Sequence, residues 1–142
     1  MKSKLSLILI IAAMATLLFA CGAAAKQVSV EVSCDEFMQQ QHISEKAEMA
    51  VGDSLIVTLC SNPSTGFQWS EMAQISDQTV LEQLGHEFIP PEKAGVVGAA
   101  GQEVWIFEAL KKGTSVISME YSRPWEGGEE GEWTFNLTVV VK

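Results

Sequence analysis

A nine-residue run near the C-terminus most strongly constrains the fold, because its side chains alternate with a period of two. Trp133, Phe135, Leu137, Val139 and Val141 alternate with Thr134, Asn136, Thr138 and Val140. A period of two places each set on its own face of a β-strand. The run therefore predicts a strand with one buried face, which needs neighbouring strands and a second layer to cover it.

Shorter strand-like runs precede this one and are separated by glycine and proline turns. The other predicted strands span residues 28–32, 55–59, 67–69, 104–109 and 114–121. Two stretches stay open: residues 35–47 suit a turn of helix or an irregular crossing, and residues 75–88 suit a strand or a short helix. About seven short strands without an internal repeat predict an all-β chain that forms one antiparallel β-sandwich domain.

The N-terminal segment has the composition of an export signal. Lys2 and Lys4 precede an apolar stretch, residues 5–19, that is too short for a comfortable membrane span, and the small Ala20 follows. The order Leu-Phe-Ala-Cys at residues 18–21 is similar to a bacterial lipobox, in which the cysteine becomes the lipid-bearing first residue.

This pattern divides the chain into three parts. The predicted signal peptide covers residues 1–20, a lipidated tether covers 21–26 and the folded domain covers 27–142. We expect an exported protein that is anchored to the bacterial cell envelope, and so to the membrane, through a lipid on Cys21. Secretion without a lipid is the alternative.

Charge and length limit the partners. Loss of residues 1–20 removes Lys2 and Lys4 but no acidic residue, so the net charge falls from −9 to −11. A chain this acidic is a poor partner for nucleic acid. About 120 remaining residues suffice for one domain with a modest core, and we expect a monomer.

Two cysteines remain besides Cys21. Outside the cytoplasm Cys34 and Cys60 can form a disulfide, which would brace a small domain. The alternative is a pair of buried free thiols. The export signal favours the disulfide.

Three segments between the predicted strands have the composition of rigid loops. They are residues 62–67 (Asn-Pro-Ser-Thr-Gly-Phe), residues 95–101 with Gly95, Gly98 and Gly101, and residues 123–126 (Arg-Pro-Trp-Glu). Proline fixes φ and glycine permits a positive φ, so each segment alone could be an ordinary turn. A tryptophan beside an arginine on a stiff loop is instead typical of a protein-binding surface.

Together these loops resemble the chagasin-like inhibitors of papain-like cysteine peptidases. The family pattern is an Asn-Pro-Thr-Thr-Gly-aromatic loop, a glycine-rich loop and an Arg-Pro-Trp loop. Ser64 replaces the first threonine, the third loop matches fully at residues 123–125, and the middle loop carries fewer glycines than is common. The resemblance covers roughly residues 51–141, and three ordered motifs are far more specific than one.

The resemblance implies an immunoglobulin-like sandwich that inhibits such peptidases reversibly and tightly, with no catalytic residue, cofactor or metal of its own. Residues 63–66 would enter the cleft and cover the catalytic cysteine, residues 95–101 would lie along the non-primed side, and residues 123–125 would grip the primed side. The implied peptidase-binding residues are Asn62, Pro63, Ser64, Thr65, Gly66, Phe67, Gly95, Gly98, Gly101, Arg123, Pro124 and Trp125. The alternative is a lipid-anchored immunoglobulin-like module that binds a cell-surface carbohydrate or protein.

The individual side chains support a binding surface more than an active site. His42 and His86 stand apart from any nucleophile or metal-like cluster, so surface or turn positions are expected for both. The acidic residues Glu126, Glu129, Glu130 and Glu132 suit a solvated loop tip, because the ligand spacing of a calcium loop is absent.

The four tryptophans separate into two groups. Trp69, Trp105 and Trp133 lie in predicted strands and are expected in the core or on a sheet face, whereas Trp125 is expected to be exposed. Within residues 62–67, we expect Asn62 and Gly66 to shape the loop and Ser64 and Thr65 to make contacts.

Overall fold

The computed structural model of the protein describes residues 22–92 and 98–142. The predicted signal peptide, Cys21 and Gly95 lie outside these residues. Within the described residues, no helix is long and apolar enough to cross a membrane.

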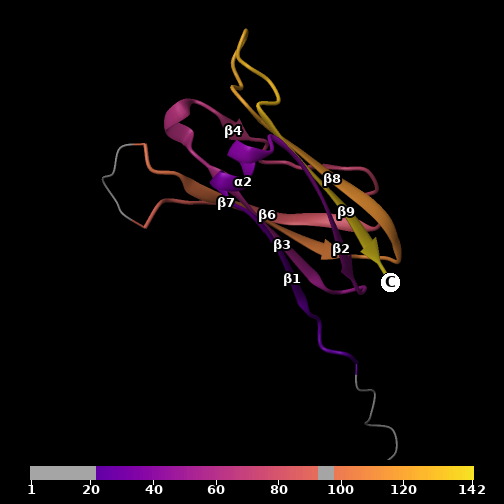
Figure 1. The fold of residues 1–142 in the computed structure, drawn as a ribbon. Coiled ribbons are helices and arrows are strands. Elements are labelled where there is room, and N and C mark those ends of the chain that lie inside the picture. The colour runs from indigo at the N-terminus through magenta and orange to yellow at the C-terminus, as the bar shows by residue number, and fades with distance from the viewer. Residues whose placement is uncertain (1–21, 93–97) are drawn as a thin grey trace, which may run out of the picture.

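The described chain forms two β-sheets that pack face to face (Figure 1). The first sheet has the order β1 (Gln27–Val32), β3 (Ser54–Ser61), β7 (Gly101–Ala109) and β6 (Leu81–Ile89). The second has the order β2 (His42–Met49), β9 (Trp133–Val141), β8 (Gly113–Ser122) and β4 (Gln68–Trp69), and β5 (Gln74–Ile75) also pairs with β8. The predicted β-sandwich is confirmed.

The core lies between the sheets and consists of the inward set of each alternating strand. In β9 the buried residues are Phe135, Leu137, Val139 and Val141, as the period of two predicts. Trp69 and Trp105 are also buried, and each indole nitrogen donates to a backbone carbonyl, that of Cys60 at 2.8 Å and that of Glu71 at 3.1 Å. The large aromatic side chains therefore enter the core without an unsatisfied donor.

Two strand pairings are parallel, so each sheet is mixed rather than purely antiparallel as predicted. β1 pairs with β3, and β2 pairs with β9. Parallel neighbours need a long crossover between them. Here the crossovers exist because the chain leaves β1, passes through α2 (Cys34–Gln39), runs along β2 in the second sheet and only then returns to β3.

The structure shows what the two open stretches form. Residues 35–47 contain the predicted turn of helix, α2, followed by the strand β2, and residues 75–88 contain most of β6. β2 buries Ile43, Ala47 and Met49 but exposes Glu45, which interrupts its apolar alternation. β6 is a strand rather than a helix, with an irregularity between Gln83 and Gly85. Each strand lies at the edge of its sheet, where one side has no neighbouring strand among the described residues.

His86 occupies a different environment from the one predicted. His42 is exposed, but His86 lies in β6 with its ring nitrogen 2.7 Å from a carboxylate oxygen of the buried Glu103. The hydroxyl of Ser61 donates to the other Glu103 oxygen at 2.6 Å. The prediction of a surface or turn position for His86 is wrong, because the residue lies within β6 with its side chain largely buried against Glu103 of β7.

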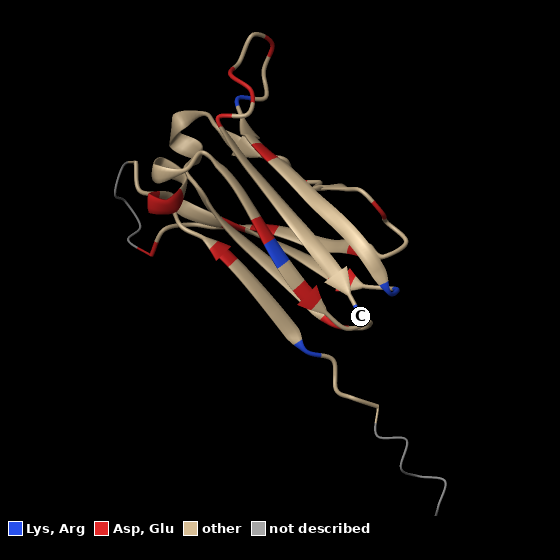
Figure 2. Cartoon of the chain, turned by 45° about the vertical axis from the view of Figure 1, so that its right-hand side comes forward, with Lys and Arg blue, Asp and Glu red and all other residues tan. Residues whose placement is uncertain are grey.

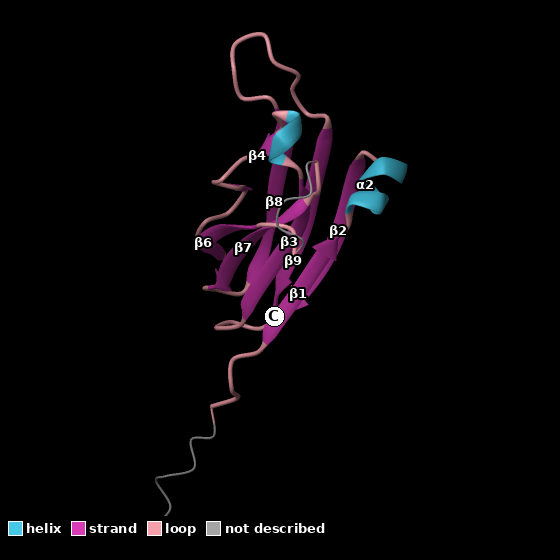
Figure 3. Cartoon of the chain, turned by 90° about the vertical axis from the view of Figure 1, so that its left-hand side faces the viewer, coloured by secondary structure: helices cyan, strands magenta, loops and turns pink. Residues whose placement is uncertain are grey.

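The short helix α2 connects the sheets at one end of the sandwich (Figure 3). Ser33 caps it: its hydroxyl accepts from the Glu36 amide, and the Glu36 carboxylate accepts from the Ser33 amide, which lowers the pKa of Glu36. Phe37 is fully buried and stacks on Trp133 with ring centroids 4.9 Å apart. Cys34 forms a disulfide with Cys60 of β3, with 5.1 Å between the Cα atoms. The helix is therefore fixed at its start and its middle.

Candidate functional site

The three predicted loops leave the same end of the sandwich. β3 ends at Ser61, which pairs with Gly101 at the start of β7, and Gln68 of β4 pairs with Ser122 at the end of β8. Residues 62–67, 98–100 and 123–132 consequently emerge from neighbouring strand ends, and Figure 1 shows residues 123–132 projecting beyond the others. The end from which β1 starts is the opposite one.

Hydrogen bonds within the loop fix residues 62–67. The Asn62 side-chain oxygen accepts from the Ser64 amide at 3.3 Å and from the Ser64 hydroxyl at 2.6 Å. The Thr65 hydroxyl donates to the Asn62 carbonyl at 2.7 Å. These bonds shape η2 (Pro63–Thr65), whose three side chains stay exposed. Asn62 thus shapes the loop as predicted, but Ser64 and Thr65 also use their hydroxyls inside it.

Gly66 is where the first and third loops touch. Its φ is +83°, a left-handed conformation that favours glycine. The Trp125 ring packs against it so closely that a Cβ on Gly66 would lie 2.6 Å from a ring carbon. Trp125 remains 54% exposed, so its outer face is free for a partner while its inner face is supported.

Arg123 connects the same two loops with its guanidinium group. The group donates to the Glu129 carboxylate at 2.7 Å and to the Thr65 carbonyl at 3.3 Å, and it lies over the Phe67 ring at 4.4 Å. The Arg123 amide also donates to the Glu129 carbonyl, at 2.8 Å. Arg123 therefore holds the loops together.

Asn62 also links the first loop to the middle one. Its side-chain nitrogen donates to the Gly98 carbonyl at 3.0 Å, and its backbone amide donates to the Tyr121 hydroxyl at 2.8 Å. Gly101 belongs to β7 and is buried, and a Cβ there would lie 2.4 Å from the Ile89 carbonyl oxygen. Its missing side chain permits this close packing of β7 against β6. Of the predicted middle-loop glycines, Gly98 is the one exposed among the described residues.

Aromatic residues support the loops from below. Phe67 is buried and stacks on Tyr121 with ring centroids 5.5 Å apart, and Tyr121 stacks on Trp133 at 4.7 Å. Trp133 is half-buried, so it completes this stack at the margin of the core. The expected division of the tryptophans is correct, since Trp69 and Trp105 are buried in the core, Trp133 packs against it and Trp125 is exposed.

Acidic residues surround the third loop. Figure 2 shows red acidic positions along the projecting loop and a blue basic position at its base. Glu126, Glu130 and Glu132 are exposed as predicted, but Glu129 pairs with Arg123 and thereby positions it. In residues 22–92 and 98–142 no group of three or more His, Cys, Asp and Glu side chains is arranged to hold a metal ion.

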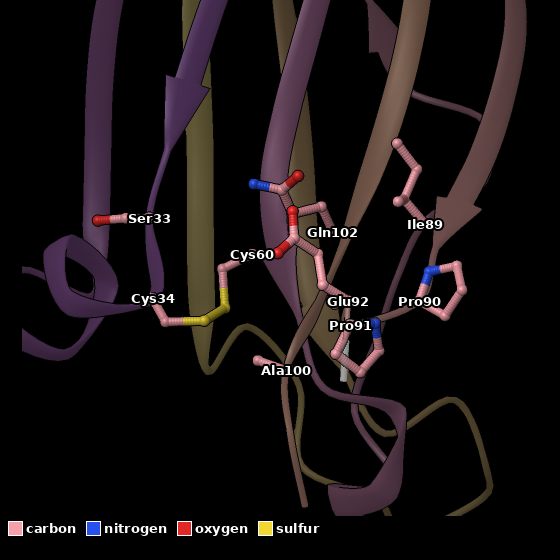
Figure 4. A pocket seen from close by; sticks show the side chains of 10 residues that line it. Ser33, Cys34, Cys60, Ile89, Pro90, Pro91, Glu92, Ala100 and Gln102 are labelled. Carbon is pink, nitrogen blue, oxygen red and sulfur yellow. A yellow bond between two sulfur atoms is a disulfide. The ribbon is translucent and has the colours of Figure 1, made fainter. Parts of the chain in front are cut away.

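Two hollows flank the loops on the side of the disulfide. The first, of about 380 Å³, lies between the disulfide and residues 89–92 (Figure 4). The second, of about 420 Å³, lies between α2 and the first and third loops, and Met38, Phe67 and Trp133 contribute apolar walls to it.

The geometry suits a protein-binding edge. Three loops are joined by direct contacts, and their exposed parts are the η2 turn, Gly98 and the Pro124-Trp125 pair. Sequence reasoning missed Glu129 and Tyr121 as positioning residues. In the sequence, the one feature that pointed to Glu129 or Tyr121 was proximity to Arg123.

Comparison with known proteins places this edge in context. A family model described as Chagasin family peptidase inhibitor I42 matches residues 48–139. Chagasin from Trypanosoma cruzi is 30% identical over 103 residues, covering 71% of this chain and 91% of its own length.

Two solved structures share the fold. The cysteine protease inhibitor EhICP2 from Entamoeba histolytica has a TM-score of 0.65 and 24% identity, with 85% of this chain and 100% of that one covered. PbICP-C, solved in complex with falcipain-2, has a TM-score of 0.57 and 19% identity, with 83% and 100% covered.

Proposed function

This chain belongs to the chagasin family of peptidase inhibitors, and we propose that it inhibits papain-like cysteine peptidases by filling their active-site cleft with residues 62–67. Membership makes the chain a peptidase inhibitor and not an enzyme. Cysteine peptidases are its target class, in keeping with the cysteine protease inhibitor and the falcipain-2 complex among the similar structures.

The first loop supplies the obstruction. Pro63, Ser64 and Thr65 are exposed at its tip, and they would cover the catalytic cysteine of the peptidase. Because the loop is held by its own hydrogen bonds, it does not extend into the conformation that presents a scissile carbonyl to the nucleophile. Cleft blockage without cleavage follows.

The middle and third loops hold the two sides of the cleft. Residues around Gly98 lie along the non-primed side, and Pro124 and Trp125 grip the primed side. Trp125 is suited to anchor the complex, because tryptophans supported from one face and open on the other are typical hot spots.

One observation carries this proposal: the loops are coupled before any partner binds. Trp125 packs on Gly66, Arg123 donates to the Thr65 carbonyl, and Asn62 donates to the Gly98 carbonyl. A preformed edge loses little conformational entropy on binding, which permits tight association at a standard interface of roughly 1,600 Å².

Titration of the purified protein against papain tests the proposal. We expect stoichiometric, reversible inhibition at nanomolar concentrations, and no inhibition of the serine peptidase trypsin as a control. Absence of papain inhibition by the folded protein at micromolar concentration would refute it.

We also propose that residues 1–20 are removed on export, that Cys21 carries the lipid, that residues 21–26 form the tether and that the mature protein is a monomer. The sequence pattern of residues 18–21 supports the lipid, and an oxidising compartment suits the Cys34–Cys60 disulfide. Incorporation of a labelled fatty acid into the wild type but not into Cys21→Ala would be the expected result, with equal labelling of both refuting it.

The carbohydrate-binding alternative is not favoured by the family assignment. A sugar site combines aromatic platforms with convergent polar groups. At this end Trp125 is the exposed aromatic side chain, and the loop residues Arg123 and Thr65 use their polar side chains within the loops.

A further inference from the structure

The helix α2 lies at the same end of the sandwich as the three loops. Figure 3 shows α2 and η2 as the two helical segments near this end. The disulfide joins the first residue of α2 to Cys60, two residues before Asn62. The helix and the first loop are therefore held in a fixed relation by a covalent link.

The hollow beside α2 is continuous with the loop edge. It holds about 420 Å³, and its walls include Asn62, Thr65 and Arg123 from the loops. Met38 and the disulfide form the opposite wall, and Phe67, Tyr121 and Trp133 contribute aromatic surface. A protein bound across the first and third loops would therefore lie next to this hollow.

Met38 stands at the margin of the hollow and is 69% exposed. A single exposed methionine needs no explanation by itself. Here its neighbour Phe37 is fully buried and Ser33 caps the helix, so the backbone that presents Met38 is rigid. The flexible thioether can then adapt to an apolar partner at low entropic cost.

We propose that α2 is a fourth contact region of the inhibitor, in which Met38 and the adjacent hollow receive an apolar side chain from the wall of the peptidase cleft. This inference rests on the proposed function, since the loops bring the peptidase to this surface. The apolar walls favour an aliphatic or aromatic side chain. The exposed Glu132 at its margin is suited to accept a hydrogen bond from a backbone amide of that wall.

Inhibition of papain by two matched variants of the full chain tests the proposal. Met38→Gln keeps the side-chain length and net charge but removes the apolar contact, and we expect the inhibition constant to rise roughly five- to tenfold through faster dissociation. Met72→Gln is the control, because Met72 is 71% exposed and lies in neither the three loops nor this hollow. We expect it to inhibit like the wild type.

A second measurement does not depend on the strength of the contact. Benzoylphenylalanine at position 38 should crosslink to papain on illumination, whereas the same group at position 72 should not. Equal inhibition constants for Met38→Gln and Met72→Gln, together with no crosslink from position 38, would overturn the fourth contact while leaving loop-mediated inhibition intact. Failure of the wild type to inhibit papain would instead refute the proposed function and this inference with it.

Discussion

The first and third loops lie side by side but are built on opposite principles. In residues 62–67 the polar side chains bond back to the loop itself, and the exposed surface is a compact turn. In residues 123–132 a longer loop carries Trp125, whose ring is more than half exposed. The first loop offers a shape, and the third offers a side chain.

The difference indicates how the energy of binding is divided. A loop that works by shape tolerates loss of a single hydroxyl but not a change of backbone, whereas a loop that works through one anchor loses most when that anchor is removed. Gly66 joins the two, because its missing side chain leaves room for Trp125.

Loss of the disulfide should have the largest effect, on stability. Cys34→Ser with Cys60→Ser opens a bridge between residues 26 apart in sequence, and the chain-entropy model gives a loss of about 3.5 kcal/mol in the free energy of unfolding. Urea unfolding of the double variant measures it. The bridge at Cys60 also holds the start of the first loop. Papain inhibition should therefore weaken as well. An unchanged unfolding midpoint would contradict the brace.

Gly66→Ala should weaken inhibition by about 3 kcal/mol, roughly a hundredfold in the inhibition constant. The alanine would have a strained positive φ, and its Cβ would displace the Trp125 ring. Gly52→Ala is a matched control, since Gly52 has a φ of +87° with no atom near its Cβ position and lies in the turn between β2 and β3. If both variants weaken inhibition equally, contact between the two loops is not the cause.

Trp125→Ala should weaken inhibition by about 2 kcal/mol, mainly through faster dissociation. Stopped-flow or surface-binding kinetics would measure it. Combining it with Gly66→Ala sharpens the comparison: once the ring is absent, Gly66→Ala should cost less than it does alone, and strict additivity would show that the loops act independently.

Glu129→Gln should weaken inhibition by about 1 kcal/mol or less, because an exposed ion pair contributes little. The variant removes the charge that holds Arg123 over Phe67. Glu130→Gln removes a charge from the same loop and should have no effect. If both variants weaken inhibition equally, the loss of negative charge is the cause and the position of Arg123 is not.

Thr65→Ala should have the smallest effect, about 0.5 to 1 kcal/mol. It removes the two hydrogen bonds of the Thr65 hydroxyl, to the Asn62 carbonyl and from the Phe67 amide, while the Asn62–Ser64 bonds that also shape the first loop remain. Thr65→Ser keeps the hydroxyl and should inhibit like the wild type. A loss as large as that of Trp125→Ala would show that the first loop also depends on a side-chain anchor.

The parts of the fold with strict alternation were predictable from the sequence. The strand over residues 133–141 matches β9, and the Val28, Val30 and Val32 pattern matches β1. β2 was missed because Glu45 stands where an apolar residue would complete the alternation, and an edge strand tolerates such a residue at the solvent. Parallel pairing could not be predicted from local pattern, since it depends on where a distant strand returns.

The loops were predictable as motifs but not as one unit. The residues at positions 62–67 and 123–125 carry the family pattern in the sequence itself. Their contacts join positions about 60 residues apart, such as Arg123 with Thr65, and no local pattern encodes these. The pairing of His86 with Glu103 and the role of Gly101 in packing β7 against β6 also depend on contacts between different strands, so they could not be predicted from local pattern either.

The chain enters β1 at the end opposite the loops (Figure 1). The lipid proposed on Cys21 would therefore attach the protein at the end away from a bound peptidase. With the tether proposed for residues 21–26, its length would set the volume that the inhibitor can search, and so the effective concentration a nearby peptidase meets, without altering the intrinsic strength of the complex. Reach and affinity are separately adjustable in this architecture.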